Sequence, residues 1–154
     1  MKTSLDDIRW RCVGFDALTA GELYEVLALR SEVFVVEQSC VFQDMDGADA
    51  QAIHLLGVLH GKLVAYARCF DAGLTFPEAS VGRIVTQNTL RGTGAGHVLL
   101  QKAIACVARH WGPQPIRIGA QARLESFYVG HGFVKNGAPY MEDGIAHIEM
   151  LRPA

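Results

Sequence analysis

The chain has 154 residues, of which half are hydrophobic and 19% are charged, and its formal net charge is −2. This composition excludes a disordered chain, because it offers enough apolar surface for one sizeable core. We therefore expect a single domain over residues 1–154. The small negative charge gives no electrostatic basis for binding nucleic acid or an anionic membrane.

The start of the chain and its cysteines indicate the compartment and the cofactors. The first ten residues lack the apolar segment of a signal peptide, and no apolar run reaches transmembrane length. The four cysteines are scattered without a C-x-x-C pair, which argues against metal clusters and redox dithiols. We expect a cytoplasmic protein with reduced thiols, no metal and no membrane partner.

The first predicted elements are a strand and a helix. Residues 8–15 have the composition of a strand. Thr19 and Glu22 then form the pattern of a capping box, and apolar residues at helical spacing extend the helix to about Val36. Arg30 lies close to this apolar stripe, where a charge usually belongs to a solvated edge or an internal ion pair.

Residues 37–51 show no periodicity and are expected to form a loop. The loop carries Asp44, Asp46 and Asp49, but the spacing is wrong for an EF-hand and the closing glutamate is missing. We interpret these carboxylates as turn-forming and helix-capping groups.

Two strands, 53–59 and 63–70, are predicted to form a hairpin around His60, Gly61 and Lys62. His54 interrupts the first of them and is a candidate base, although a strand histidine is more often simply hydrogen-bonded. A loop over 71–79 then leads to a central strand over 81–86, which is rich in β-branched residues.

A glycine-rich loop over 91–96 follows a short turn and leads into an apolar helix over 97–110. Gly92, Gly94 and Gly96 can adopt positive φ and leave room for a ligand, while the first N–H groups of the helix have no partner within it. The helix dipole adds partial positive charge there, and Arg91 adds a cation. This arrangement predicts a phosphate site, although neither the P-loop pattern nor the G-x-G-x-x-G fingerprint is present.

The rest of the chain alternates between strands and helices. Gly112 and Pro113 end the long helix, and a strand over 116–121 and a helix over 122–129 follow. A last strand over 140–150 is broken by a turn at Asp143-Gly144. The order β-α-β-β-β-α-β-α-β predicts an α/β fold with a mixed sheet flanked by helices, in which residues 81–121 form a right-handed parallel unit.

The glycine loop resembles R/Q-x-x-G-x-G/A, the coenzyme A pyrophosphate loop of the GNAT acyltransferases, with Arg91, Gly94 and Gly96 at its defining positions. The segment 127–133 resembles the F-Y-x-x-x-G-F sequence that closes the GNAT core. The resemblance implies acetyl-CoA as the acyl donor, and two parallel strands that splay apart to hold the thioester. The residues that it implies for coenzyme binding are Ile84, Val85, Thr86, Arg91, Gly92, Thr93, Gly94, Ala95 and Gly96.

A closer resemblance to the ElaA-like branch of GNAT proteins covers nearly the whole chain. It is carried by four strings, at residues 29–38, 43–47, 119–122 and 142–148. The resemblance implies acetyl transfer to a primary amine of a small molecule or peptide, without naming the acceptor. A non-catalytic acyl-CoA sensor on the same fold is the alternative, and a homodimer is left open.

The resemblance also implies a catalytic role for Tyr128, as the general acid that protonates the departing thiolate. For a tyrosine on an amphipathic helix, the alternative is a core residue. Many family members carry a general-base carboxylate on the central strand, and residues 81–86 have none. Four residues remain as candidate bases, and the sequence does not rank them: Glu37, His54, Glu142 and His147. Cys40 is a conceivable nucleophile without a supporting motif.

Overall fold

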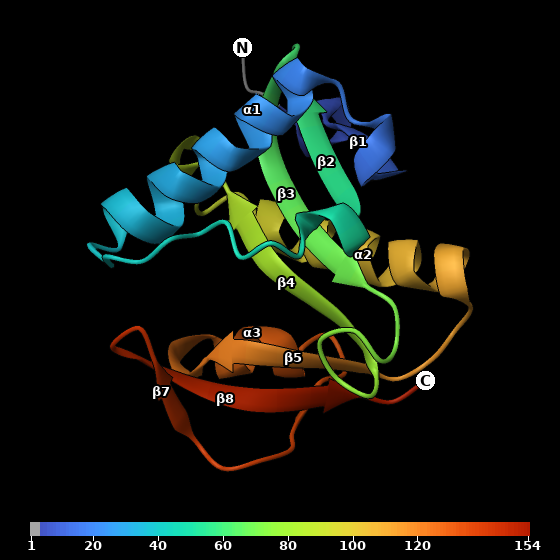
Figure 1. The fold of residues 1–154 in the computed structure, drawn as a ribbon, viewed down its shortest axis with the longest axis vertical. Coiled ribbons are helices and arrows are strands. Elements are labelled where there is room, and N and C mark those ends of the chain that lie inside the picture. Colours follow the sequence, from blue (N-terminus) through green and yellow to red (C-terminus); the bar gives the residue numbers. More distant parts are fainter. Residues whose placement is uncertain (1–3) are drawn as a thin grey trace.

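A computed structural model describes residues 4–154 and shows one mixed sheet covered by helices on both faces (Figure 1). The strands are β1 (Arg9–Gly14), β2 (Ile53–Leu59), β3 (Lys62–Phe70), β4 (Ala79–Thr86), β5 (Ile116–Gln121), β6 (Val134–Lys135), β7 (Tyr140–Glu142) and β8 (Ile145–Arg152). Their spatial order is β1-β2-β3-β4-β5-β8-β6, and β7 pairs with β8. The expected α/β fold is confirmed.

The helices are α1 (Ala20–Arg30), α2 (Ala95–Trp111) and α3 (Glu125–Val129). A π-helix, η3 (Ser31–Glu37), continues α1 directly. Short 3₁₀ turns are η1 (Leu5–Asp7), η2 (Phe15–Ala17), η4 (Asp49–Gln51), η5 (Asn88–Leu90) and η6 (Ala122–Leu124).

The first helix begins where the sequence predicts. The Thr19 side chain accepts a hydrogen bond from the N–H of Glu22, and the Glu22 carboxylate accepts one from the N–H of Thr19. The helix widens before it ends, because the N–H of Gln38 bonds to the carbonyl of Val33, and that of Cys40 to Val35. Such π-helical turns are rare and occur often at functional sites.

Two apolar layers hold the helices on the sheet. One face of α2 buries Leu99, Leu100, Ala103, Cys106 and Val107 against the sheet, and α1 with η3 covers the opposite face (Figure 1). The predicted helix over 97–110 is thus confirmed. Within residues 4–154, no helix is both long and apolar enough to span a lipid bilayer.

The parallel pair β4 and β5 separates almost at once. Only Ala79 with Ile116 and Ser80 with Arg117 are paired, although both strands continue well beyond these residues. Figure 1 shows the two strands meeting at one end and diverging toward the other. The splay that the GNAT resemblance implies is present, and it opens the sheet at its centre.

The predicted last strand is two strands rather than one. Asp143 and Gly144 adopt positive φ, 49° and 76°, and reverse the chain so that β7 pairs back onto β8. The turn position is therefore confirmed. A turn with two successive residues at positive φ matches the twist of a hairpin, which is why the chain folds back here instead of continuing.

Candidate active site

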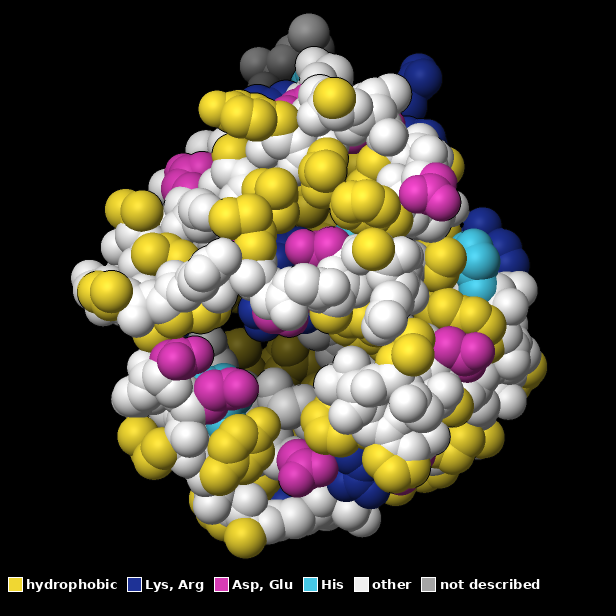
Figure 2. Space-filling view, viewed as in Figure 1, with side chains coloured by type: hydrophobic (Ala, Val, Ile, Leu, Met, Phe, Trp, Pro, Cys, Tyr) yellow, Lys and Arg dark blue, Asp and Glu magenta, His cyan; other side chains and the backbone are white. Residues whose placement is uncertain are grey.

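Two adjoining cavities occupy the opening between β4 and β5. Their volumes are about 490 and 510 Å³. Figure 2 shows a hollow on this side of the molecule, with Lys or Arg atoms visible inside it. The first cavity extends toward the glycine loop, and the second toward β7 and the 38–48 segment. Residues that line both cavities are Phe34, Gln38, Ile84, Gln121, Leu124 and Tyr128.

The glycine loop presents bare backbone at the start of α2. Gly92 and Gly94 have φ of 77° and 86°, and a Cβ built on either would meet no atom within 4 Å. Among the described residues, the N–H groups of Gly94 and Gly96 have no hydrogen-bond acceptor. Gly96 is helical, and a Cβ added to it would lie 3.7 Å from the ring of Phe127. Open space, unpaired N–H groups and a 17-residue helix behind them fit an anion such as a pyrophosphate.

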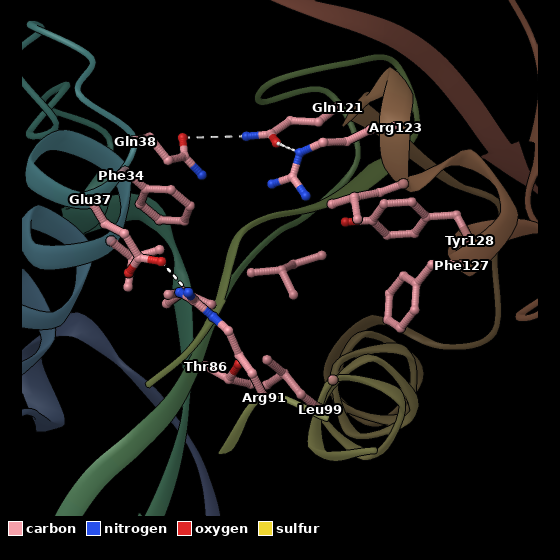
Figure 3. A pocket seen from close by; sticks show the side chains of 15 residues that line it. Phe34, Glu37, Gln38, Thr86, Arg91, Leu99, Gln121, Arg123, Phe127 and Tyr128 are labelled. Atoms are coloured by element: carbon pink, nitrogen blue, oxygen red, sulfur yellow. Dashed lines mark hydrogen bonds and ion pairs between the residues drawn. The ribbon is translucent and has the colours of Figure 1, made fainter. Parts of the chain in front are cut away.

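Arg91 and Glu37 form an ion pair at the edge of the first cavity (Figure 3). Their side chains remain 49% and 36% exposed, so solvent reaches both. The hydrogen bond from Arg91 lowers the pKa of Glu37 below its ordinary value. Glu37 is therefore a weak base while the pair persists.

Tyr128 points into the opening from α3, and its ring is nearly buried (Figure 3). The ring packs edge-on against Phe127 and Phe133, with centroids 5.1 and 5.7 Å away. Burial raises the pKa of Tyr128 to about 12. The phenol stays protonated at neutral pH, so it can donate a hydrogen bond or a proton to a group in the opening.

The central strand β4 bulges beside the cavities. Opposite β3, Tyr66 pairs with Val85 and Arg68 with Gly82, so β4 holds one extra residue over this stretch. Arg83 takes a left-handed φ of 48° there. A bulge leaves backbone groups without ladder partners. This stretch of β4 borders both cavities, so those groups can meet a ligand.

Three arginines and three aspartates form a partly buried network behind the second cavity. Arg30 is fully buried and bonds to Asp44 and Asp49, each at 2.8 Å. Arg68 bonds to Asp46 at 2.7 Å and to Asp49 at 2.9 Å, and Arg83 bonds to Asp44 at 2.9 Å. We call these six residues the arginine–aspartate network: Arg30, Asp44, Asp46, Asp49, Arg68 and Arg83.

The interpretation of the three aspartates as turn-forming and helix-capping groups is corrected, because each of them pairs with an arginine of the network. Asp46 does accept a hydrogen bond from the N–H of Ala48, as a turn residue would. Its main partner is Arg68, however, whose hydrogen bond lowers the pKa of Asp46 well below its ordinary value. Burial raises the pKa of Asp49, but Arg30 and Arg68 outweigh it and lower that pKa. The aspartates balance buried arginines, and Arg30 is in the internal ion pair that the sequence left as one alternative.

The wall formed by β7 and β8 carries a histidine–carboxylate pair. His147 is 8% exposed, and its Nδ1 lies 2.7 Å from the carbonyl oxygen of Ile145. Its Nε2 lies 3.6 Å from a carboxylate oxygen of Glu142. The ring stacks on Tyr140, with centroids 5.5 Å apart. Both His147 and Glu142 line the second cavity.

The structure separates the four candidate bases. Glu37 borders the first cavity, while Glu142 and His147 border the second. His54 lines neither, since it is fully buried between the hydroxyl of Tyr66, 2.6 Å from Nδ1, and the carbonyl of Asp49, 2.9 Å from Nε2. Burial lowers the pKa of His54. A buried ring with both nitrogens engaged matches the hydrogen-bonded strand histidine of the sequence analysis.

Two contacts cross the mouth of the opening. Gln121 donates to the side-chain oxygen of Gln38 at 3.4 Å (Figure 3), and the thiol of Cys40 donates to the carbonyl of Asp143 at 3.2 Å. Cys40 is buried and bonded in this way. No role was expected from the sequence for Gln121 or for Arg83. The available signal for Arg83 was that it is the one charged residue of β4.

The ElaA-like strings come together at this place. Residues from all four strings border the second cavity, including Gln38, Asp46, Gly119 and His147. A Cβ on Gly119 would lie 2.5 Å from the hydroxyl of Tyr140, so glycine is needed to seat the ring that stacks on His147.

Known proteins resemble this chain in sequence and in structure. The family model of the acetyltransferase (GNAT) domain matches residues 24–152. Protein ElaA of Escherichia coli is 40% identical over 147 residues, which cover 94% of this chain and 96% of that protein. The crystal structure of Escherichia coli ElaA has a TM-score of 0.88 at 39% identity, and covers 94% of this chain and 99% of that one. The crystal structure of an acyl-CoA N-acyltransferase from Pseudomonas aeruginosa gives 0.90 at 40% identity, with the same coverage.

Proposed function

Because the chain belongs to the GNAT acetyltransferase family, we propose that it transfers an acetyl group from acetyl-CoA to a primary amine of a small molecule or peptide. The feature that best supports this proposal is the opening between β4 and β5, because its first cavity is lined both by Gly96, whose N–H is unpaired among the described residues, and by Tyr128. Free thiols at all four cysteines fit a cytoplasmic enzyme.

The glycine loop and Arg91 would hold the coenzyme phosphates. The unpaired N–H groups at the start of α2 would donate to the phosphate oxygens, and the open space at Gly92 and Gly94 would admit them. Backbone groups of Ile84, Val85 and Thr86 would pair with the pantetheine arm, since these residues line the first cavity. Bound acetyl-CoA would supply the thioester that an amine attacks and the thiolate that leaves.

Tyr128 would then protonate the leaving thiolate. Its phenol lies in both cavities and stays protonated at neutral pH. A positioned proton donor contributes about 10²–10⁴-fold to a rate. Backbone N–H groups of the β4 bulge would stabilise charge on the thioester oxygen.

The alternative is a sensor that binds acyl-CoA without turnover. It is favoured by the absence of a carboxylate on β4, where many family members place their base. Both functions require coenzyme binding, but only an enzyme releases free thiol when an amine is present.

Two measurements test the proposal together. Isothermal titration calorimetry should show binding of acetyl-CoA but not of NAD or ATP at the same concentration. Free thiol should then appear from acetyl-CoA in a panel of primary amines, polyamines and short peptides. Binding without thiol release for any amine would favour the sensor, and no binding at millimolar acetyl-CoA would overturn both functions.

A further inference from the structure

On the wall of the second cavity, the nearly buried His147 pairs with the exposed Glu142. We infer that His147 is the base that takes a proton from the acceptor amine, and that Glu142 stabilises the imidazolium that results. This inference rests on the proposed acetyl transfer. It ranks the candidate bases, which the sequence left unranked.

The hydrogen bond at Nδ1 fixes the tautomer of His147. A carbonyl oxygen only accepts hydrogen bonds, so at 2.7 Å from the oxygen of Ile145 the Nδ1 atom carries a proton. The neutral ring therefore has its lone pair on Nε2. Orientation of a catalytic imidazole by a bond at its other nitrogen is a recurring arrangement.

The surroundings of Nε2 suit a proton acceptor. The Glu142 carboxylate lies 3.6 Å away, so it attracts the ring once the ring is charged. Cross-strand pairing sets His147 between Gln121 on β5 and Tyr140 on β7. Gln121 borders both cavities, so His147 is next to the point where they join.

Other titratable groups share the second cavity with His147. From β7 and its turn these are Tyr140, Glu142 and Asp143, from α3 it is Tyr128, and from the opposite wall they are Cys40, Asp46, Arg68 and Arg83. The charged residues of the opposite wall are already paired with one another within the arginine–aspartate network. Glu142 is thus the carboxylate whose ion-pair partner, among the described residues, is His147.

The other candidates are less suited to the role. Glu37 is held by Arg91 and borders the first cavity only. His54 is closed off from both cavities. The side chain of Glu142 is 61% exposed, whereas that of His147 is 10% exposed and fixed by its bond to Ile145.

The protons balance through three groups. An amine reaches the site as an ammonium ion and gives one proton to Nε2 of His147, which leaves the nitrogen lone pair free to attack. The N–C bond forms as the C–S bond breaks, and Tyr128 gives its proton to the departing sulfur. The nitrogen loses a second proton as the amide forms, and this proton replaces the one that Tyr128 gave. His147 passes the first proton to solvent.

The tautomer can be measured without any acceptor. In protein labelled with ¹⁵N-histidine, long-range ¹H–¹⁵N correlation should show the His147 proton on Nδ1. A proton on Nε2 would overturn the inference.

Kinetics test the role in transfer. In His147→Asn, the side-chain amide can still donate to the Ile145 carbonyl, but Nε2 is gone. With the most active amine of the panel, kcat/KM at neutral pH should fall by about 10²–10⁴-fold and recover as pH rises, because solution then supplies the free amine. Acetyl-CoA affinity should not change, which separates this result from a failure of the proposed function.

His110 offers a matched control. Its Nδ1 also lies near a carbonyl oxygen, that of Cys106 at 3.0 Å, but it lines neither cavity. His110→Asn should keep the wild-type pH profile. An equal loss at every pH in His147→Asn would assign His147 a structural role and overturn the inference.

Discussion

Arg91, which begins the glycine loop, is paired with Glu37, the last residue of η3. These residues are 54 positions apart in the chain, and both border the first cavity. A coenzyme phosphate at the loop would compete with Glu37 for the same guanidinium, so Glu37 would oppose the proposed coenzyme binding.

Glu37→Gln should therefore tighten acetyl-CoA binding. The pair is half-exposed and screened by solvent, so we expect a gain of roughly two- to fivefold in affinity, measured by calorimetry at low salt. Glu78→Gln makes the same change in charge at a pair with Arg117 outside both cavities, and should leave the affinity unchanged. Equal effects of the two variants on affinity would show that the net charge of the protein, and not the pair of Glu37 with Arg91, controls acetyl-CoA binding.

Gly94→Ala should weaken acetyl-CoA binding by roughly tenfold or more. A Cβ would occupy the open side of the loop and disfavour the φ of 86°, so N–H groups that donate to a charged phosphate would shift. Gly61→Ala is the matched control, because Gly61 has a similar φ of 79° and open space in the β2–β3 turn. Both variants should lose about 1 kcal/mol of stability. Equal acetyl-CoA affinities of Gly94→Ala and Gly61→Ala would show that the glycine loop does not bind the coenzyme phosphates.

Tyr128→Phe should lower kcat by about tenfold or more, with little change in acetyl-CoA affinity. The ring supplies the packing against Phe127 and Phe133, so the melting temperature should change little. Tyr66→Phe is the contrasting control, since it removes the hydroxyl bonded to His54 and should lower the melting temperature while turnover per folded molecule persists. Wild-type turnover in Tyr128→Phe would remove this phenol from the mechanism.

Arg30→Met should destabilise the protein by about 3 kcal/mol, because it leaves buried carboxylates of Asp44 and Asp49 with one cation fewer. For a chain of this size, that corresponds to a melting temperature lower by roughly 6–12 °C. Arg11→Met removes a half-exposed partner of Glu22 and should cost no more than about 1 kcal/mol. Similar losses in thermal unfolding would contradict a buried network.

Stability should fall as the pH drops below 6.5. Burial lowers the pKa of His54 in the folded state, so the unfolded chain binds one proton more between its ordinary value of 6.5 and the folded value. The free energy of unfolding should decline there by up to about 1.4 kcal/mol per pH unit for this residue. His131, whose pKa is also lowered by burial, adds to the same trend.

Denaturant unfolding at several pH values checks this expectation. His54→Gln should flatten the dependence between pH 6.5 and 5, while His131→Gln should remove only the smaller part that belongs to a more exposed ring. An unchanged slope in His54→Gln would show that other groups cause the acid sensitivity.

The sequence determined those features that depend on neighbouring residues. The capping box at Thr19, the hairpin after β2, the glycine loop and the turn at Asp143 and Gly144 each follow from residues a few positions apart. Local backbone conformation and helix ends are set at this range, so the order of elements could be predicted as far as α3, after which the structure has three strands where one was predicted.

The tertiary structure decided which distant side chains meet. Arg30 bonds to Asp44 across 14 positions and Arg83 bonds to Asp44 across 39, so the aspartates looked like turn residues in the sequence. Only the folded structure distinguishes the two candidate histidines, because His54 is buried against Tyr66 and His147 lies on a cavity wall. Periodicity reports which face of an element is apolar, but ion pairs and cavities arise where separate elements pack, and the relative placement of these elements is a property of the folded chain.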